Sequence, residues 1–294
     1  MAKTSKTIAI TGANGLLGST LVQHFRAAGW QVIGLVRSPS QMPTLTNVRY
    51  VAYNMDRPLS ASTFKGVDVI VHTAYIKEES SGSHALKRNQ YAAKQLLIAT
   101  KHSTTAQLIF ISTMSAHQTA VSVYAKQKLA IEKLFQQAGG TVLRSGLIIG
   151  NGGLVKQMYS FMKSKHLVPL IGGGKQPLQT IAVYDLANVI DRIITCNLTG
   201  LYTVATPKVY TYKNFYRLLG QRFGIHFIFV PVPISILGIG LTLAAKSGLT
   251  LSASKDNLLG LKHLQSIDTK SDLKRIGVKL DSLEQALKKT TITS

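Results

Sequence analysis

The sequence predicts an α/β protein with a doubly wound parallel sheet and a smaller mixed α/β lobe toward the C-terminus. Apolar, strand-like runs alternate with amphipathic helical patterns through the first 150 of the 294 residues. Such alternation places parallel strands side by side, with crossover helices on both faces of the sheet. A glycine-rich stretch after Gly150 marks the point where this pattern changes.

The expected strands of the first part are short and apolar, and they cover residues 7–11, 31–36, 48–53, 68–72, 107–112 and 141–144. The helices expected between them cover residues 16–28, 83–102 and 122–138, with a short helix over 60–65. Beyond Gly150 we expect a helix over 154–165, a loop over 168–179, a helix over 187–195 and a strand over 201–205. Residues 1–150 and about 178–204 form the expected sheet domain, and residues 151–177 and 205–294 form the expected substrate lobe.

Three glycines follow the first expected strand with the spacing G-x-x-G-x-x-G. Gly12 permits a tight turn, Gly15 lets a pyrophosphate approach the backbone, and Gly18 lets the helix pack closely. The helix N-terminus then offers free N–H groups and the positive end of its dipole to phosphates. This strand–turn–helix context predicts a dinucleotide site in a Rossmann sheet, and a tight turn without a ligand is the alternative. The expected contacts are Gly12, Asn14, Gly15, Leu16, Leu17 and Gly18.

Arg37 and Ser38 end the second expected strand, at the position that selects between the two nicotinamide cofactors. An acidic residue there would bond the ribose 2′-OH of NAD, whereas an arginine suits the 2′-phosphate of NADP. We therefore expect NADP(H) as the preferred cofactor and NAD(H) as the alternative, unless Arg37 is simply a surface cation. Further groove residues are expected after strands three and four: Asn54 at the adenine edge, then His72, Thr73 and Ala74.

Tyr124 and Lys128 form a Y-x-x-x-K pattern that puts both side chains on one face of a helix. An ammonium beside the phenol would lower its pKa from about 10, which makes tyrosine a usable general acid or base. The same lysine can bond the nicotinamide ribose. Ser112 and Thr113, at the end of the preceding strand, offer hydroxyls that can hold a substrate oxygen. Tyr159 begins a second Y-x-x-x-K match but lacks such a strand end upstream, so we expect it to be structural.

The net charge of +22 is spread evenly along the chain. Residues 1–150 carry 16 Lys and Arg against 5 Asp and Glu, and residues 151–294 carry 18 against 7, so each part is +11. An even spread argues against a nucleic-acid module, whereas a positive field favours anionic small ligands. The single cysteine, Cys196, excludes an internal disulfide, and no Cys/His cluster predicts a metal site.

Residues 227–245 are very apolar but contain Pro231 and Pro233. We expect a strand end, a Pro-Val-Pro corner and a short helix from Ser235, all buried in the lobe. Peripheral docking on a membrane is the alternative. Only six residues precede the first expected strand, so we expect no signal peptide and a cytoplasmic location.

Taken together, these motifs resemble the extended short-chain dehydrogenase/reductase (SDR) superfamily, in its NAD(P)-dependent epimerase/dehydratase family. The matching pieces are Asn89 and residues 11–18, 67–74, 110–115, 124–128, 143–150, 169–174, 183–185 and 272–287. The resemblance implies that Thr113 is the catalytic hydroxyl, with Ser112 as second choice, and that Asn89 belongs to the cofactor site. It also implies a homodimer through the helices expected at 83–102 and 122–138.

Three positions depart from the family pattern. Ser145 stands where a proline usually follows the arginine, and Asn54 stands where an aspartate often contacts adenine. The connection from Thr113 to Tyr124 is also shorter than in typical sugar-nucleotide epimerases. A short connection removes a loop that would shape the substrate site, which favours a simple carbonyl reductase.

The sequence therefore predicts an NADP(H)-dependent oxidoreductase that acts on the carbonyl or hydroxyl of a small molecule, and the positive charge of the chain favours an anionic one. We expect substrate contacts from residues 172–179 and from the C-terminal lobe. A nucleotide-sugar epimerase or dehydratase, in which the cofactor is regenerated in each cycle, is the first alternative. A non-catalytic NADPH-binding accessory protein, as in respiratory complex I, is the second alternative.

Overall fold

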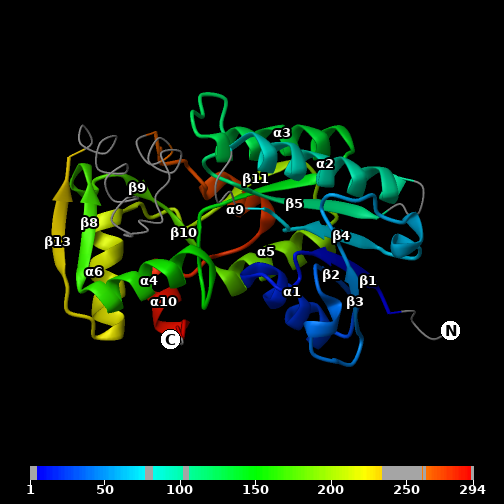
Figure 1. Ribbon diagram of the computed structural model, residues 1–294, viewed down its shortest axis with the longest axis horizontal. Coiled ribbons are helices and arrows are strands. Elements are labelled where there is room, and N and C mark those ends of the chain that lie inside the picture. The colour runs from blue at the N-terminus through cyan, green and yellow to red at the C-terminus, as the bar shows by residue number, and fades with distance from the viewer. Residues whose placement is uncertain (1–4, 77–81, 102–105, 234–259, 261–262, 293–294) are drawn as a thin grey trace.

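A seven-stranded parallel sheet runs through the protein in the order β11-β6-β5-β4-β1-β2-β3 (Figure 1). The computed structural model describes residues 5–76, 82–101, 106–233, 260 and 263–292, with residues 82–86 placed only as helix. The strand order reverses between β1 and β4, which makes the crevice at their carboxyl ends the place where such sheets bind ligands. The strands are β1 (Thr7–Thr11), β2 (Gln31–Val36), β3 (Val48–Ala52), β4 (Val69–His72), β5 (Gln107–Thr113), β6 (Thr141–Ser145) and β11 (Leu201–Val204).

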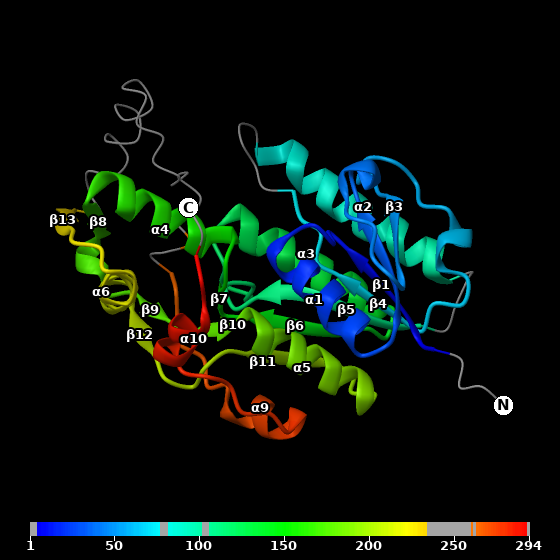
Figure 2. The ribbon, with the colours of Figure 1, turned by 90° about the horizontal axis from the view of Figure 1, so that it is seen from below.

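Helices cover both faces of this sheet, which confirms the doubly wound fold predicted from the sequence. On one face lie α1 (Leu16–Ala27) and α5 (Val183–Thr195), and on the other lie α2 (Gly82–Lys101) and α3 (Val123–Gln137) (Figures 1 and 2). Alternate residues of each strand supply the two cores, because strand side chains point to opposite faces. Ile8 and Ile10 of β1 pack with Leu21 and Phe25 of α1, whereas Ala9 joins the core under α2 and α3.

The smaller part of the protein consists of three two-stranded sheets and their helices, around a third hydrophobic core. The strand pairs are β7 (Leu147–Ile149) with β10 (Thr180–Ala182), β9 (Pro177–Leu178) with β12 (Tyr210–Thr211), and β8 (Leu167–Ile171) with β13 (Ile228–Val232). The helices around this core are α4 (Gly153–Lys165), α6 (Tyr212–Phe223) and α10 (Leu283–Lys289), whereas α9 (Lys270–Ile276) packs through Leu273 and Ile276 on the core that α1 and α5 cover. Short 3-10 helices lie at η1 (Pro39–Gln41), η2 (Ala61–Phe64) and η3 (Gly172–Gly174).

The prediction of a loop over residues 168–179 is wrong, because this stretch holds β8, η3 and β9. Pro169 suggested a loop, yet β8 is a strand whose one partner in the described part of the chain is β13, and an edge strand tolerates proline. Val168 and Leu170 are buried on the inner side of this strand. Helix α5 also begins at Val183, four residues earlier than expected, directly after strand β10.

The apolar stretch 227–245 is described only in its first part. Residues Ile228–Val232 form β13, so the strand runs through Pro231 where a corner was expected. The helix expected from Ser235 lies outside the described residues. Among the helices that the structure describes, none is both long and apolar enough to cross a membrane.

Candidate active site

The glycine turn after β1 is built so that two of its glycines admit no side chain. Gly12 has a φ of +67°, and a Cβ there would lie 3.0 Å from the Cα of Ala74. A Cβ on Gly18 would lie 2.1 Å from the carbonyl oxygen of Gly12. These contacts set the distance between β1, the start of α1 and the segment after β4.

Gly15 differs from Gly12 and Gly18 because an added side chain at Gly15 would meet open space instead of packed backbone. It is the N-cap of α1 in extended backbone, and an added Cβ would meet only the Gly12 carbonyl oxygen, at 3.3 Å. The first N–H groups of a helix have no acceptor within the helix, and the first turn of α1 carries no acidic side chain. The glycine turn and the first turn of α1, residues 12–18, thus form a cradle with open space, free N–H groups and the positive end of the helix dipole. These three features fit the pyrophosphate of a dinucleotide.

The segment after β7 closes one side of this cradle, which the sequence patterns did not predict. A Cβ on Gly150 would lie 2.9 Å from Leu16 Cδ1, and one on Gly152 would lie 3.3 Å from Leu16 Cβ. Glycines therefore let the chain cross directly over the first residue of α1.

The residues expected to recognise the adenosine half lie on the surface, after the neighbouring strands. Arg37 and Ser38 follow β2, and both are exposed. Asn54 follows β3 and is also exposed, and its Oδ1 accepts a hydrogen bond from the N–H of Asp56 at 2.9 Å. Because β1, β2 and β3 are parallel neighbours, all three strands end at the same edge of the sheet.

The segment after β4 is tied to the end of β1 by a small hydrogen-bond network. The hydroxyl of Thr73 donates to the carbonyl of Thr11 at 2.6 Å, and the N–H groups of Thr73 and Ala74 donate to Thr11 Oγ1 at 3.2 Å. Asn89 of α2 accepts from the N–H of Ile76 at 2.9 Å and donates to its carbonyl at 3.0 Å. Asn89 thus fixes the shape of this segment through its backbone.

The side chain of His72 lies in the core, which leaves only its backbone to line the groove. It is fully buried, with its ring stacked on Phe110 and Phe135 and its Nδ1 2.8 Å from Thr11 Oγ1. Since the Thr11 hydroxyl already accepts two N–H groups, its own proton points to Nδ1. Burial, together with the charge of Lys128, lowers the pKa of His72 to about 3. His72 is therefore a neutral core residue.

Tyr124 and Thr113 meet where β5 ends and α3 begins. Ser122 caps α3 by accepting from the N–H of Ala125 at 3.2 Å, which places Tyr124 in the first helical turn. The Tyr124 hydroxyl is hydrogen-bonded to Thr113, and its ring, 36% exposed, packs edge-on against Tyr75. Partial removal of the phenol from water raises the pKa of Tyr124 to about 12, against the opposing effect of the bond to Thr113.

Lys128 lies one turn further along α3, as predicted, and its ammonium is hydrogen-bonded to the end of β5. Its Nζ donates to the carbonyl of Ile111 at 2.9 Å and lies 4.8 Å from the ring centres of Tyr75 and Phe110. Burial lowers the pKa of Lys128 to about 7, while the charge of Glu132 acts in the opposite direction. The expected lowering of the Tyr124 pKa by Lys128 is not seen in this arrangement, where removal of the phenol from water is the largest influence on that pKa.

Glu132 is a site residue that the sequence patterns did not single out. Its carboxylate is buried, and it accepts from Arg144 Nε at 2.9 Å, from an Arg144 Nη at 2.6 Å and from the Ser112 hydroxyl. The Ser112 hydroxyl is thus bonded to Glu132, while Thr113 bonds Tyr124. The spacing in the sequence could have identified it, since Glu132 follows Lys128 by four residues and is the one acid of α3.

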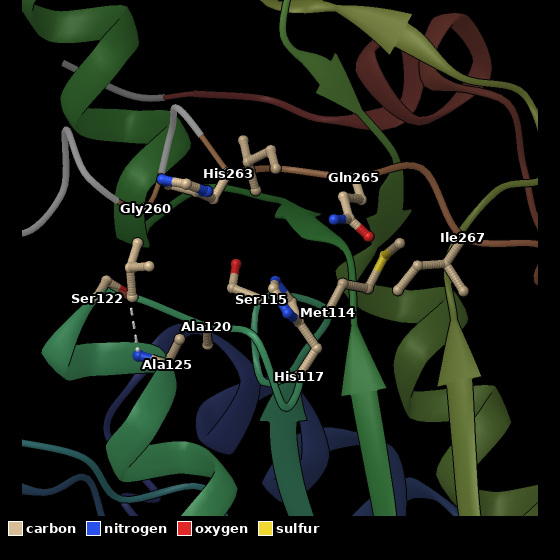
Figure 3. Close-up of a pocket in the computed structure, with 12 residues that line it drawn as sticks. Met114, Ser115, His117, Ala120, Ser122, Ala125, Gly260, His263, Gln265 and Ile267 are labelled. Atoms are coloured by element: carbon tan, nitrogen blue, oxygen red, sulfur yellow. Dashed lines mark hydrogen bonds between the residues drawn. The ribbon is translucent and has the colours of Figure 1, made fainter.

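A small cavity of about 60 Å³ opens beside this cluster (Figure 3). The residues just after β5, the start of α3, Gly260 and residues between 263 and 267 line it. The polar side chains around it include Ser115, His117, Ser122, His263 and Gln265. The expected contacts from residues 172–179 are not among the described lining residues. Gln179 does not line the cavity but holds the lining residue Ile267 in place. Its side chain accepts from the N–H of Ile267 at 2.8 Å and donates to the carbonyl of Ile267 at 3.0 Å.

A parallel sheet with a glycine turn at its switch point and a Tyr/Lys helix beside it defines the extended SDR class of α/β proteins. The chain belongs to the NAD dependent epimerase/dehydratase family, whose model matches residues 8–204. This result confirms the family expected from the sequence motifs.

Two curated relatives match part of this chain. It is 26% identical over 217 residues to NADH dehydrogenase [ubiquinone] 1 alpha subcomplex subunit 9, mitochondrial, of Arabidopsis thaliana, across 69% of this chain and 54% of that protein. It is 29% identical over 150 residues to ceramide reductase of Caulobacter vibrioides (strain NA1000 / CB15N), across 49% of this chain and 47% of that protein. The chain spans about half the length of the curated relatives it matches.

Solved structures share the fold over almost the whole chain. MoeE5 in complex with UDP-glucuronic acid and NAD has a TM-score of 0.76 and 16% identity, with 97% of each chain covered. UDP-glucuronic acid 4-epimerase from Bacillus cereus in complex with NAD has a TM-score of 0.75 and 16% identity, with the same coverage.

Proposed function

We propose that this chain is an oxidoreductase that uses NADP(H) in preference to NAD(H) and acts on a carbonyl or hydroxyl group of a small molecule. The pairing of the Tyr124 hydroxyl with Thr113, one helical turn from Lys128, carries this proposal. This pair lies at the carboxyl end of β5, and the glycine cradle lies at the same edge of the sheet, after β1. The family and the bound NAD of similar solved structures support a nicotinamide cofactor.

In this proposal the cradle and the exposed arginine bind the cofactor. The N–H groups at the start of α1 bind the pyrophosphate, and Arg37 binds the 2′-phosphate that distinguishes NADP(H). When bound, the nicotinamide supplies or accepts a hydride. The residues after β4, held by Thr11 and Asn89, form the wall of the groove between the cradle and Tyr124, because β4 lies between β1 and β5.

Tyr124 and Thr113 handle the substrate oxygen. In the reducing direction the Thr113 hydroxyl holds that oxygen, and Tyr124 donates its proton to it as the carbonyl carbon becomes an alcohol carbon. A pKa of about 12 keeps Tyr124 protonated at neutral pH, so it is ready to donate. Lys128 in its charged form stabilises the phenolate that remains, because an opposite charge nearby favours the ionised form.

Substitution of Tyr124 by phenylalanine tests this proposal. We expect Tyr124→Phe to lower NADPH-dependent reduction of a panel of carbonyl compounds by at least about 100-fold, while NADPH binding is retained. Tyr159→Phe is the matched control, because Tyr159 heads the other Y-x-x-x-K match but is buried against Phe223 in the third core. Equal turnover by Tyr124→Phe and the native chain would refute the assignment. Turnover without net consumption of NADPH would point to an epimerase or dehydratase.

The position of Lys128 favours a second candidate, a non-catalytic NADPH-binding accessory protein. Its ammonium bonds the carbonyl of Ile111, and the pKa of Tyr124 is raised, so the pair is not arranged as an activated base. The match to a subunit of NADH dehydrogenase is in line with this candidate. Tight NADPH binding with no turnover on any carbonyl compound, by both the native chain and Tyr124→Phe, would establish it.

A further inference from the structure

Tyr75, in the segment after β4, contacts both members of the Tyr124/Lys128 pair. Its ring packs at 90° to the ring of Tyr124, with 5.2 Å between the two ring centres. The Nζ of Lys128 lies over the Tyr75 ring, 4.8 Å from its centre. One side chain from the wall of the groove therefore touches the phenol and the ammonium that α3 carries.

The hydroxyl of Tyr75 anchors this ring to α3. It donates to Gln127 Oε1 at 2.5 Å, and Gln127 is a buried residue directly before Lys128. The same Oε1 accepts from Asn89 Nδ2 at 3.4 Å, and Asn89 also bonds the backbone of Ile76, the residue after Tyr75. The ring is thus fixed at its tip through Gln127, and its backbone is fixed through the next residue.

The ammonium of Lys128 is buried with few hydrogen-bond acceptors around it. Lys128 is 5% exposed, and among the residues that the structure describes the carbonyl of Ile111 is the one acceptor of its Nζ. An ammonium has three N–H donors, and the face of an aromatic ring attracts a cation most strongly where water is excluded. The rings of Tyr75 and Phe110 both lie 4.8 Å from Nζ, so they supply part of the stabilisation that further acceptors would give.

We propose that Tyr75 is a positioning residue of the Tyr124/Lys128 pair, whose ring holds the Lys128 ammonium in place and supports the ring of Tyr124. This inference rests on the proposed function, because a reaction at Tyr124 is what requires the pair to keep its geometry. The Tyr75 ring favours the charged form of Lys128, which is the form that stabilises the Tyr124 phenolate. A leucine at this position would still exclude water but has no aromatic face, so the charged form would lose this support.

Three other titratable groups lie around Lys128, and substitution of Tyr75 removes none of them. Glu132, on the same helix, acts to raise the pKa of Lys128. His72, at the end of β4, has a pKa of about 3 and is neutral at neutral pH. Tyr124 has a pKa of about 12 and is also neutral there. A difference in the titration of Lys128 between variants of Tyr75 therefore reports on the ring of Tyr75.

An NMR titration of the full chain with ¹³C-labelled lysine tests the proposal. The Cε resonance of Lys128, assigned with Lys128→Arg, follows the protonation of its amine. We expect the pKa of Lys128 to fall by about one pH unit in Tyr75→Leu and to stay near the native value in Tyr75→Phe, which keeps the ring. In reduction of carbonyl compounds by NADPH, the alkaline limb of the kcat/KM profile of Tyr75→Leu should move to lower pH by the same amount. Its kcat should fall by about tenfold, because the support of the phenolate is weaker.

Tyr91→Leu is the matched control, because Tyr91 is 37% exposed on α2, and it should change neither the Lys128 titration nor the pH profile. Should Tyr75→Leu not fold, Tyr75→Met takes its place, because methionine also fills the space without a ring. The proposal is overturned if Lys128 titrates alike in the native chain and in Tyr75→Leu, or if Tyr75→Leu and Tyr75→Phe shift it equally. The NMR titration needs no reaction, so the predicted shift without turnover by any form would refute the reductase function and support the placement of Lys128 by Tyr75.

Discussion

Alanine substitutions at Gly15 and Gly18 separate the binding role of the glycine turn from its structural role. At Gly15 the backbone is extended, with φ −77° and ψ 171°, which alanine adopts freely. The new methyl would contact only the Gly12 carbonyl oxygen, at 3.3 Å. Alanine is the poorer N-cap, but it also lowers the entropy of the unfolded chain. These effects nearly cancel, so the free energy of unfolding should change by less than about 1 kcal/mol.

Gly18→Ala should behave in the opposite way. Its Cβ would lie 2.1 Å from the Gly12 carbonyl oxygen and 2.8 Å from the Cα of Ala13, so the backbone of the turn must move. Overpacking of this kind costs about 1–3 kcal/mol of stability. Nucleotide binding should then fall together with stability.

Urea unfolding and NADPH titration, followed by nucleotide fluorescence, measure the two effects on the same samples. For Gly15→Ala we expect near-native stability with NADPH affinity lower by at least about tenfold, because the methyl fills the space that the pyrophosphate needs. Gly29→Ala serves as a control for a glycine outside the turn, and it should leave NADPH affinity unchanged. Native NADPH affinity in a stable Gly15→Ala protein would refute this account of the cradle.

Three further predictions follow from individual side chains. Arg37→Ala should weaken NADPH binding by about 10–100-fold and leave NADH binding unchanged in parallel titrations, because a charge-assisted bond to the 2′-phosphate is lost. His72 has a folded-state pKa of about 3 against an ordinary value of 6.5, so its neutral form contributes stability that is present above pH 6.5 and lost as pH falls toward 3, by about 5 kcal/mol in all. His72→Phe should therefore lose less stability than the native chain between pH 7 and pH 4 in urea unfolding. Glu132→Gln removes the charge that raises the pKa of Lys128, so the alkaline limb of the kcat/KM profile should move to lower pH.

Each of these predictions has a control or a contrary result. Arg49→Ala, an exposed arginine within β3, should leave NADPH affinity unchanged, and equal loss in both variants would indicate only general attraction. A native pH dependence of unfolding in His72→Phe would mean that folding does not lower the pKa of His72. Glu132→Gln also leaves Arg144 without its anionic partner, so stability should fall by a few kcal/mol. An unshifted pH profile in a folded Glu132→Gln protein would remove Lys128 from the titrating site.

The central sheet could be predicted because its signals are local. The strand Thr7–Thr11 and the strand Gln31–Val36 have the predicted bounds, since a β-branched run followed by glycine or a charged residue limits each of them. The glycine turn could be predicted for the same reason. Gly12 and Gly18 are required by contacts with residues close in sequence or just after one neighbouring strand.

The remaining features depend on contacts between distant residues. The pairing of β8 with β13 joins segments about 60 residues apart, so Pro169 alone suggested a loop. His72 was expected in the groove because it ends a strand, and no local signal shows that its ring packs with Phe110 and Phe135. The direction of the Lys128 ammonium is set by the carbonyl of Ile111 on another element. Helical spacing places the lysine near Tyr124 but does not determine where its side chain points.

Titration of the purified full chain with NADPH and, in parallel, with NADH tests the central claim most directly. The groove after β1 and the exposed Arg37 predict saturable binding of both nucleotides, with the tighter dissociation constant for NADPH. Tighter binding of NADH would contradict the role given to Arg37. No binding of either nucleotide would contradict the claim that the glycine turn is a dinucleotide site.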